Sequence, residues 1–157
     1  MKLSTASTKR KCLVVLLTTL LCFQANAVCR VRSIVPVAFG NYNVFSATPT
    51  TAVGSFTVGR CTVAVPYVAT FSAGSSGNIN ARTMTSGTNV LSYNLYDSIA
   101  YTTVLGGVGG IGAAVTGAGV TARSGAIVSI YGRIPAGQDA MTSVTPYSDT
   151  VTITITF

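Results

Sequence analysis

The final stretch of the chain alternates strictly between apolar and polar residues. In residues 149–157, DTVTITITF, every second residue is apolar: Val151, Ile153, Ile155 and Phe157. A two-residue period is typical of a β-strand with one buried face. Such a strand needs a neighbour on each side or a feature that blocks its edge. The sequence shows neither there, so we expect another protein to pair with the free edge.

The rest of the chain after residue 27 also favours strands over helices. It is rich in Thr, Val, Ser, Gly and Tyr, contains no Glu or Lys, and shows no sustained 3.6-residue period. Turn-rich pieces such as SATPTT, SAGSSGN and PAGQ separate the apolar runs. Short strands at this spacing predict an all-β sandwich. The expected strands cover residues 30–35, 55–65, 66–72, 89–96, 102–105, 126–134 and 147–157.

The stretch LGGVGGIGAAVTGAGV, residues 105–120, is uncharged and rich in glycine. Two interpretations are open. Segments of this kind are usually flexible connections, here with one weak strand near residues 114–120. Alternatively, the loop is exposed for adhesion, and its candidate surface contacts are then Leu105, Val108, Ile111 and Val115.

Basic residues are concentrated at the start of the chain. Four of the ten lie within residues 1–11, followed by the apolar run CLVVLLTTLLCF and the small-residue triplet ANA. This order is typical of a secretory signal peptide, and the run is too short to span a bilayer. We therefore predict a signal peptide over residues 1–27 and one exported domain over residues 28–157. That domain contains six arginines and three aspartates, so its net charge is +3, compared with +7 for the whole chain. The charge therefore gives no reason to expect a nucleic-acid partner.

Two cysteines, Cys29 and Cys61, belong to the predicted exported domain. An even pair in an exported chain without histidine predicts a disulfide bond. The alternative, two free buried thiols, is disfavoured in an oxidising compartment. The bond would close a loop of about thirty residues and contribute about 3–4 kcal/mol to stability in the chain-entropy model.

The side chains that most catalytic sites need are missing. The chain has no histidine, so it cannot build a Ser-His or Cys-His nucleophile, and two cysteines are too few for a zinc site. Its carboxylates are Asp97, Asp139 and Asp149, each beside turn residues where aspartate is common. The GGVGGIG stretch lacks the flanking strand and helix of a phosphate-binding loop. We predict no enzymatic activity, no cofactor and no metal.

Several motifs resemble the spore coat protein U family, whose members include the pilins of archaic chaperone-usher fibres. The YGRIPAGQ and DTVTITITF motifs are the most specific of them. The chain differs from the family at Leu105, where a tryptophan is usual. The matching pieces, in family order, are VAFGNY (37–42), Cys61, ARTM (81–84), LSYNLYDSIAYTTV (91–104), YGRIPAGQ (131–138) and YSDTVTITITF (147–157).

The resemblance implies an incomplete immunoglobulin-like sandwich that lacks its seventh strand and is completed by donor-strand complementation. In such pilins a periplasmic chaperone fills the open groove first, and the N-terminal extension of a neighbouring subunit replaces it. The implied partners are a periplasmic pilus chaperone, an outer-membrane usher and neighbouring pilin subunits, and the implied location is the cell surface, reached through the periplasm. The expected acceptor groove comprises Val31, Val35, Val151, Ile153, Ile155 and Phe157.

The expected function is a structural subunit of a surface pilus with a role in adhesion or biofilm formation. Fibre-forming members usually carry an alternating donor segment before the first cysteine, whereas Cys29 directly follows the predicted cleavage region. We therefore expect a tip or initiating subunit, with an incomplete copy of a two-domain adhesin as the alternative. A secreted spore or cell-envelope coat protein is also open. A small outer-membrane β-barrel is the weakest alternative, because few strands have membrane length and tryptophan is absent.

Overall fold

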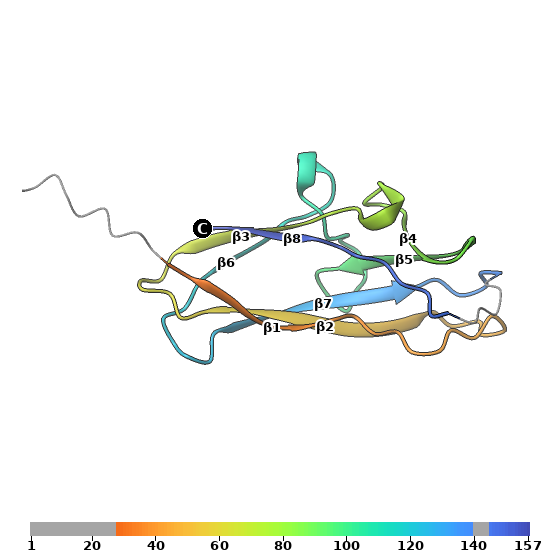
Figure 1. Cartoon of the computed structure of the whole chain (residues 1–157), viewed down its shortest axis with the longest axis horizontal. Helices are drawn as coiled ribbons and strands as arrows, with labels where there is room; N and C mark the ends of the chain where they lie inside the picture. The colour runs from red at the N-terminus through yellow and green to blue at the C-terminus, as the bar shows by residue number, and fades with distance from the viewer. Residues whose placement is uncertain (1–27, 140–144) are drawn as a thin grey trace, which may run out of the picture.

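The computed structural model describes residues 28–139 and 145–157 and shows an all-β protein of two layers (Figure 1). A five-stranded sheet has the order β1-β2-β7-β5-β4, and a three-stranded sheet has the order β6-β3-β8. The neighbouring strands run antiparallel. The elements are β1 (Arg30–Val35), β2 (Thr50–Gly59), β3 (Pro66–Phe71), the 3-10 turn η1 (Gly74–Ser76), β4 (Arg82–Ser86), β5 (Asn89–Tyr96), the 3-10 turn η2 (Val108–Gly110), β6 (Val115–Ala118), β7 (Ala126–Ile134) and β8 (Ile153–Thr156).

Three expected strands, over residues 30–35, 89–96 and 126–134, are confirmed with the same bounds as β1, β5 and β7. The strand expected over residues 66–72 corresponds to β3, and the weak strand expected near residues 114–120 corresponds to β6. Most of these segments are rich in β-branched or aromatic residues and lie between turn residues. In these segments, the strand preference of the residues therefore agrees with the pairing seen in the sheets.

The β2 strand differs from its prediction at both ends. A strand was expected over residues 55–65, but β2 begins at Thr50 and ends at Gly59. Tertiary pairing explains the early start, because Thr50 already lies opposite Ile134 of β7. The strand stops where Arg60 adopts the left-handed conformation, with a φ of 52°.

The β4 strand was not expected, one expected strand does not form, and another is shorter than predicted. Residues 102–105 take part only in isolated bridges, and of residues 147–157 only Ile153–Thr156 form β8. The β4 sequence, RTMTS, contains a single large apolar residue, Met84. Its pattern therefore gives no strand signal, and only the pairing with β5 makes it a strand.

The segment that leads into β8 contacts both sheets in turn. Ser148 first exchanges backbone hydrogen bonds with Thr85 of β4, at 3.0 and 3.1 Å. The chain then crosses to the other sheet, where β8 pairs with β3 from Phe71↔Ile153 to Val68↔Thr156. The outer edge of β4 is therefore covered at one point, and β8 forms an edge of the three-stranded sheet.

Both sheets contribute to one apolar core, which also encloses a charged residue. Arg82 is completely buried. Its guanidinium donates hydrogen bonds to the carbonyl oxygens of Ser72, Ile79 and Leu105 and to Oδ1 of Asn94, at distances of 2.7 to 3.3 Å. The apolar core residues are Phe56, Val58, Tyr67, Ala69, Phe71, Met84, Leu91, Tyr93, Leu95, Leu105, Ile130 and Ile134.

The surroundings of Arg82 affect its pKa in two opposing ways. Burial lowers the pKa of Arg82, and the nearby Tyr93 and Asp149 partly offset this effect. A buried charge is tolerated only when its hydrogen bonds are satisfied. Among the described residues, no buried side-chain nitrogen or oxygen lacks a partner, so the Arg82 cluster meets this condition.

The predicted disulfide bond is confirmed. Cys29, immediately before β1, bonds to Cys61, with an S–S distance of 2.07 Å. The bond fixes the start of β1 next to the end of β2.

The predicted signal peptide, residues 1–27, lies outside the described residues. Within the described ranges, no helix is long and apolar enough to cross a membrane.

Candidate functional site

Two strand edges face each other across one side of the sandwich. The β1 strand is the last strand of the five-stranded sheet, and β8 is the last strand of the three-stranded sheet. The backbone N–H of Ser72 donates to the carbonyl oxygen of Thr152 at 2.9 Å. Since hydrogen-bonded pairs alternate along an antiparallel ladder, Ile153 and Ile155 direct their backbone N–H and C=O groups to the free edge.

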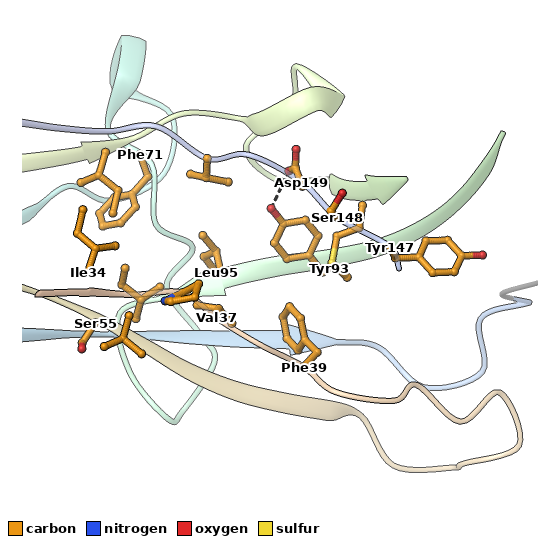
Figure 2. Close-up of a pocket in the computed structure, with 16 residues that line it drawn as sticks. Ile34, Val37, Phe39, Ser55, Phe71, Tyr93, Leu95, Tyr147, Ser148 and Asp149 are labelled. Carbon is orange, nitrogen blue, oxygen red and sulfur yellow. Dashed lines mark hydrogen bonds between the residues drawn. The ribbon is translucent and has the colours of Figure 1, made fainter. Parts of the chain in front are cut away.

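An apolar cavity of about 290 Å³ opens between these edges. One wall is the segment 34–39, the opposite wall is the segment 147–153, and core residues such as Phe71 and Leu95 form the floor. Figure 2 shows these side chains converging between the two strands. The space between the sheets therefore reaches the surface as a groove along the β1–β8 side.

An irregularity in β1 shapes the first wall. Val31 lies opposite Val58, but the register with β2 shifts between Arg32 and Val35, where Ser33 has a left-handed φ of 46°. Beyond the shift, Ile34 lines the groove although its side chain is 69% exposed. An apolar side chain that lines a cavity and still faces water indicates that the groove is open along β1.

Two glycines let the chain after β1 lie against the inner face of the sheet. A Cβ on Gly54 would lie 2.7 Å from the carbonyl oxygen of Val35, and one on Gly132 would lie 2.6 Å from the ring of Phe39. Real Cβ atoms do not approach other atoms so closely. A side chain at position 54 would displace the backbone at Val35, and one at position 132 would displace the side chains of Val37 and Phe39. Phe39 then packs edge-on against Tyr93, with ring centroids 5.9 Å apart. The VAFGNY and YGRI motifs therefore build the groove wall together.

Three of the six predicted groove residues line the cavity: Val35, Val151 and Ile153. The other three lie elsewhere along the same two strands. Ile155 packs on the core from β8, Val31 is 42% exposed on β1, and the ring of Phe157 contacts Tyr67 edge-on at 6.3 Å.

Several residues of the groove are not among those predicted from the sequence. The most prominent are Ile34, Val37 and Phe39 on the first wall and Tyr93 on the floor. The alternation of Val35, Val37 and Phe39 in VPVAF could have indicated the last part of this wall. Nothing in the sequence signals Ile34, because the register shift that directs it into the groove is a tertiary feature.

Asp149 and Tyr93 form a hydrogen-bonded polar pair in the groove lining, which also includes Ser55, Tyr147 and Ser148. The Tyr93 hydroxyl donates to Oδ2 of Asp149 at 2.7 Å, and the backbone N–H groups of Ser75 and Thr150 each donate to Oδ1 at 2.8 Å. Burial acts to raise the pKa of Asp149, but these hydrogen bonds outweigh it, so the pKa lies below its ordinary value. Burial, together with the Asp149 hydrogen bond, raises the pKa of Tyr93. The pair fixes the chain where it crosses from β4 to β8.

The predicted surface-contact loop needs a correction. Leu105 is completely buried in the core, so it cannot be a surface contact. Val115 is half-buried in β6, where it pairs with Ala69 of β3. Val108 and Ile111, in and just after η2, are each 51% exposed. The apolar surface of this stretch is therefore limited to one short turn.

Metal-ligating side chains do not gather in the described part of the chain. No group of three or more His, Cys, Asp or Glu residues lies close enough there to hold a metal ion. The arrangement that the described residues do provide is an apolar groove with unpaired backbone edges.

The chain matches a known protein family. The family model described as Spore Coat Protein U domain matches residues 15–154. A search of curated proteins finds no match. The chain is similar to a solved structure, the CsuC-CsuE chaperone-tip adhesion subunit pre-assembly complex from archaic chaperone-usher Csu pili of Acinetobacter baumannii. The sequence identity is 19% and the TM-score 0.43, with 83% of this chain and 40% of that chain covered. The match to the family model confirms the resemblance drawn from the motifs.

Proposed function

The chain belongs to the Spore Coat Protein U domain family, and we propose that it is a structural subunit of a chaperone-usher surface fibre. In this proposal the groove between β1 and β8 accepts a β-strand from a second protein. A periplasmic chaperone supplies that strand first, and a neighbouring subunit supplies it after passage through an outer-membrane usher. The subunit thus reaches the cell surface through the periplasm.

The observation that carries the proposal is the pairing of an open apolar cavity with two strand edges. Backbone groups at a free edge bind an added strand with little dependence on its sequence, and side-chain pockets provide specificity. Here Ile153 and Ile155 present the backbone groups, by the alternation of the β3–β8 ladder. The cavity of about 290 Å³ receives alternate side chains of the incoming strand.

Adhesion at the fibre tip is the finer part of the proposal. The exposed turn with Val108 and Ile111 supports it, since neighbouring exposed apolar residues often mark contact sites. Electron microscopy of fibres labelled for this subunit tests tip placement. Label repeated along the shaft would contradict the tip role and leave the fibre role intact.

Strand acceptance can be measured with a synthetic peptide of about ten residues that alternates valine and threonine. Added to the full chain, it is expected to slow amide hydrogen exchange at Ile153 and Ile155 and to raise the melting temperature. A scrambled peptide with its valines clustered is expected to do neither. The proposal would be falsified if both peptides gave equal protection or if neither gave any.

A pair of variants connects the effect to the groove. Ile153→Asp places a charge in the cavity lining and is expected to abolish the protection by the peptide. Ile127→Asp makes the same change on β7, where the side chain is 71% exposed and outside the cavity. This control is expected to respond to the peptide like the unmodified chain.

A further inference from the structure

Four of the six arginines of the described residues are exposed at one end of the five-stranded sheet. Arg30 and Arg32 alternate on β1, opposite Gly59 and Thr57 of β2. The guanidinium of Arg32 donates a hydrogen bond to the carbonyl oxygen of Arg123 at 3.2 Å. Arg60 directly follows β2. Its backbone N–H donates a hydrogen bond to the carbonyl oxygen of Ala122, the residue before Arg123. We call this cluster, Arg30, Arg32, Arg60 and Arg123, the arginine end.

No carboxylate of the described residues balances the arginine end. Asp149 is bound by Tyr93 on the groove side, and Asp139 follows the turn that contacts Ser92 of β5. Asp97 follows Tyr96, at the end of β5. Like charges held together repel one another, and Arg60 also keeps a left-handed backbone that disfavours side chains. A concentrated positive charge of this kind suits an anionic ligand, because guanidinium groups bind sulfate, phosphate and carboxylate in a fork geometry.

A patch of tyrosines continues the same outer face away from the arginine end. Tyr131 of β7 lies opposite Tyr96 of β5 and opposite Val53 of β2. Tyr101 packs edge-on against Tyr96, with centroids 5.4 Å apart, and the guanidinium of Arg133 lies 5.5 Å from the centre of the Tyr101 ring. These rings are half-buried, with part of each facing solvent. Tyrosine combines an apolar ring with a polar hydroxyl, a combination that suits the C–H faces and hydroxyls of sugar rings.

The two parts of the face lie within reach of one extended ligand. Ala126, at the arginine end of β7, is five residues from Tyr131, which corresponds to roughly 17 Å along a strand. Between them, Ser55 pairs with Ser129 and Thr57 pairs with Ile127, whose side chain is 71% exposed. The connecting surface therefore carries hydroxyls and one exposed apolar side chain.

We propose that the outer face of the five-stranded sheet binds an anionic polysaccharide. The arginine end holds its acidic groups, and the tyrosine patch contacts its sugar rings. This surface is opposite to the inner face that the groove opens onto, so the inference does not depend on strand acceptance. A nucleic acid also carries repeated negative charge, so DNA binding is the competing outcome of the test below.

The test measures binding of the full chain to heparin, with uncharged dextran and a DNA duplex as comparison ligands. The chain is expected to bind heparin more tightly than DNA at equal salt and not to bind dextran. The double variant Arg32→Gln with Arg123→Gln is expected to weaken heparin binding about tenfold or more, since charge-assisted hydrogen bonds are lost. Tyr131→Ser is expected to weaken it too, but to leave its salt dependence unchanged, because no charge is removed.

Asp139→Asn is the matched control for net charge. It raises the net charge by one unit away from the arginine end and is expected to leave heparin affinity nearly unchanged. The double arginine variant removes two charges and this control changes one. If the control strengthens binding by about half as much, in free energy, as the double variant weakens it, overall charge explains the binding and the proposed surface is wrong. Absence of heparin binding, or tighter binding to DNA, likewise overturns the inference. Melting curves of all variants distinguish lost binding from lost folding.

Discussion

The two long sides of the sandwich end their sheets in opposite ways. On the β4 side, which we call the closed side, the edge of β4 is covered at one point by Ser148. One strand further in, the amide of Gln138, which follows β7, bonds to both the N–H and the C=O of Ser92 on β5, at 2.7 and 2.8 Å. On the β1–β8 side, two edges stay apart over an apolar cavity. The closed side is completed by polar groups of the chain itself, and the open side is available to a partner.

The two sides also differ in the number of hydrogen bonds that their polar side chains make. Next to the closed side, the buried Arg82 donates hydrogen bonds to three carbonyl groups and to Asn94. The motif YGRIPAGQ ends in the glutamine that bonds to Ser92 in the middle of β5. The open side has few polar side chains, and those of Asp149 and Tyr93 bond to each other. Changes on the closed side should therefore lower stability directly, whereas changes on the open side should show their effect when a strand is bound.

The largest effect is expected from breaking the buried cluster with Arg82→Met. The substitution leaves the carbonyls of Ser72 and Leu105 without the donors that Arg82 supplies, whereas the carbonyl of Ile79 keeps its hydrogen bond from the Asn94 amide. The loss should lower the free energy of unfolding by at least about 2 kcal/mol. Urea unfolding of the full chain measures this change. Arg133→Met is the matched control on the same sheet, and its half-buried, ring-stacked guanidinium should cost under about 1 kcal/mol. Equal midpoints for the two variants would contradict the role of the cluster.

An intermediate effect is expected at Asp149, where the two sides meet. Its pKa is depressed by hydrogen bonds, so its carboxylate stabilises the folded state above the unfolded pKa of about 4, and this contribution is lost as pH falls through the lower folded pKa. Asp149→Asn should therefore destabilise the chain by about 1–2 kcal/mol at neutral pH. The gap to the unmodified chain should close as the pH falls below about 4.

Unfolding curves recorded from neutral to acid pH check this prediction. Asp97→Asn removes an exposed carboxylate outside the groove and should follow the unmodified chain throughout. Parallel curves for Asp149→Asn and the unmodified chain would show that the hydrogen bonds to Asp149 do not stabilise its ionised form.

The smallest effect is expected from removing the Gln138 amide, which bonds to β5 next to the closed side. Gln138→Ala removes both amide bonds to Ser92 and should cost about 1 kcal/mol. Its clearest readout is faster hydrogen exchange at the Ser92 amide. Gln138→Glu keeps the acceptor for the Ser92 N–H and should give an intermediate exchange rate. An unchanged exchange rate in Gln138→Ala would mean that the Gln138 side chain does not protect the Ser92 amide.

Prediction from the sequence succeeded where local pattern and pairing agree, and failed where contacts distant in sequence decide. The bounds of β1, β5 and β7 follow from short apolar runs between turns. Leu105, in contrast, is one of the candidate surface contacts of the uncharged, glycine-rich stretch, yet it is completely buried, and its carbonyl oxygen accepts a hydrogen bond from Arg82. Half of the predicted groove residues line the cavity, because a strand's period shows which face is apolar but not which part of that face stays uncovered.

By itself, the sequence determined the all-β class, the Cys29–Cys61 bond and the family, because these depend on composition, period and motif. Tertiary structure decided which strand edges stay open. The register shift at Ser33 directs Ile34 into the groove, and the crossing after Ser148 carries the chain from β4 to β3. Both events depend on pairing between segments far apart in the chain. An alternating strand such as VTITITF specifies its buried face through its own period, whereas its neighbours depend on how the rest of the chain folds around it.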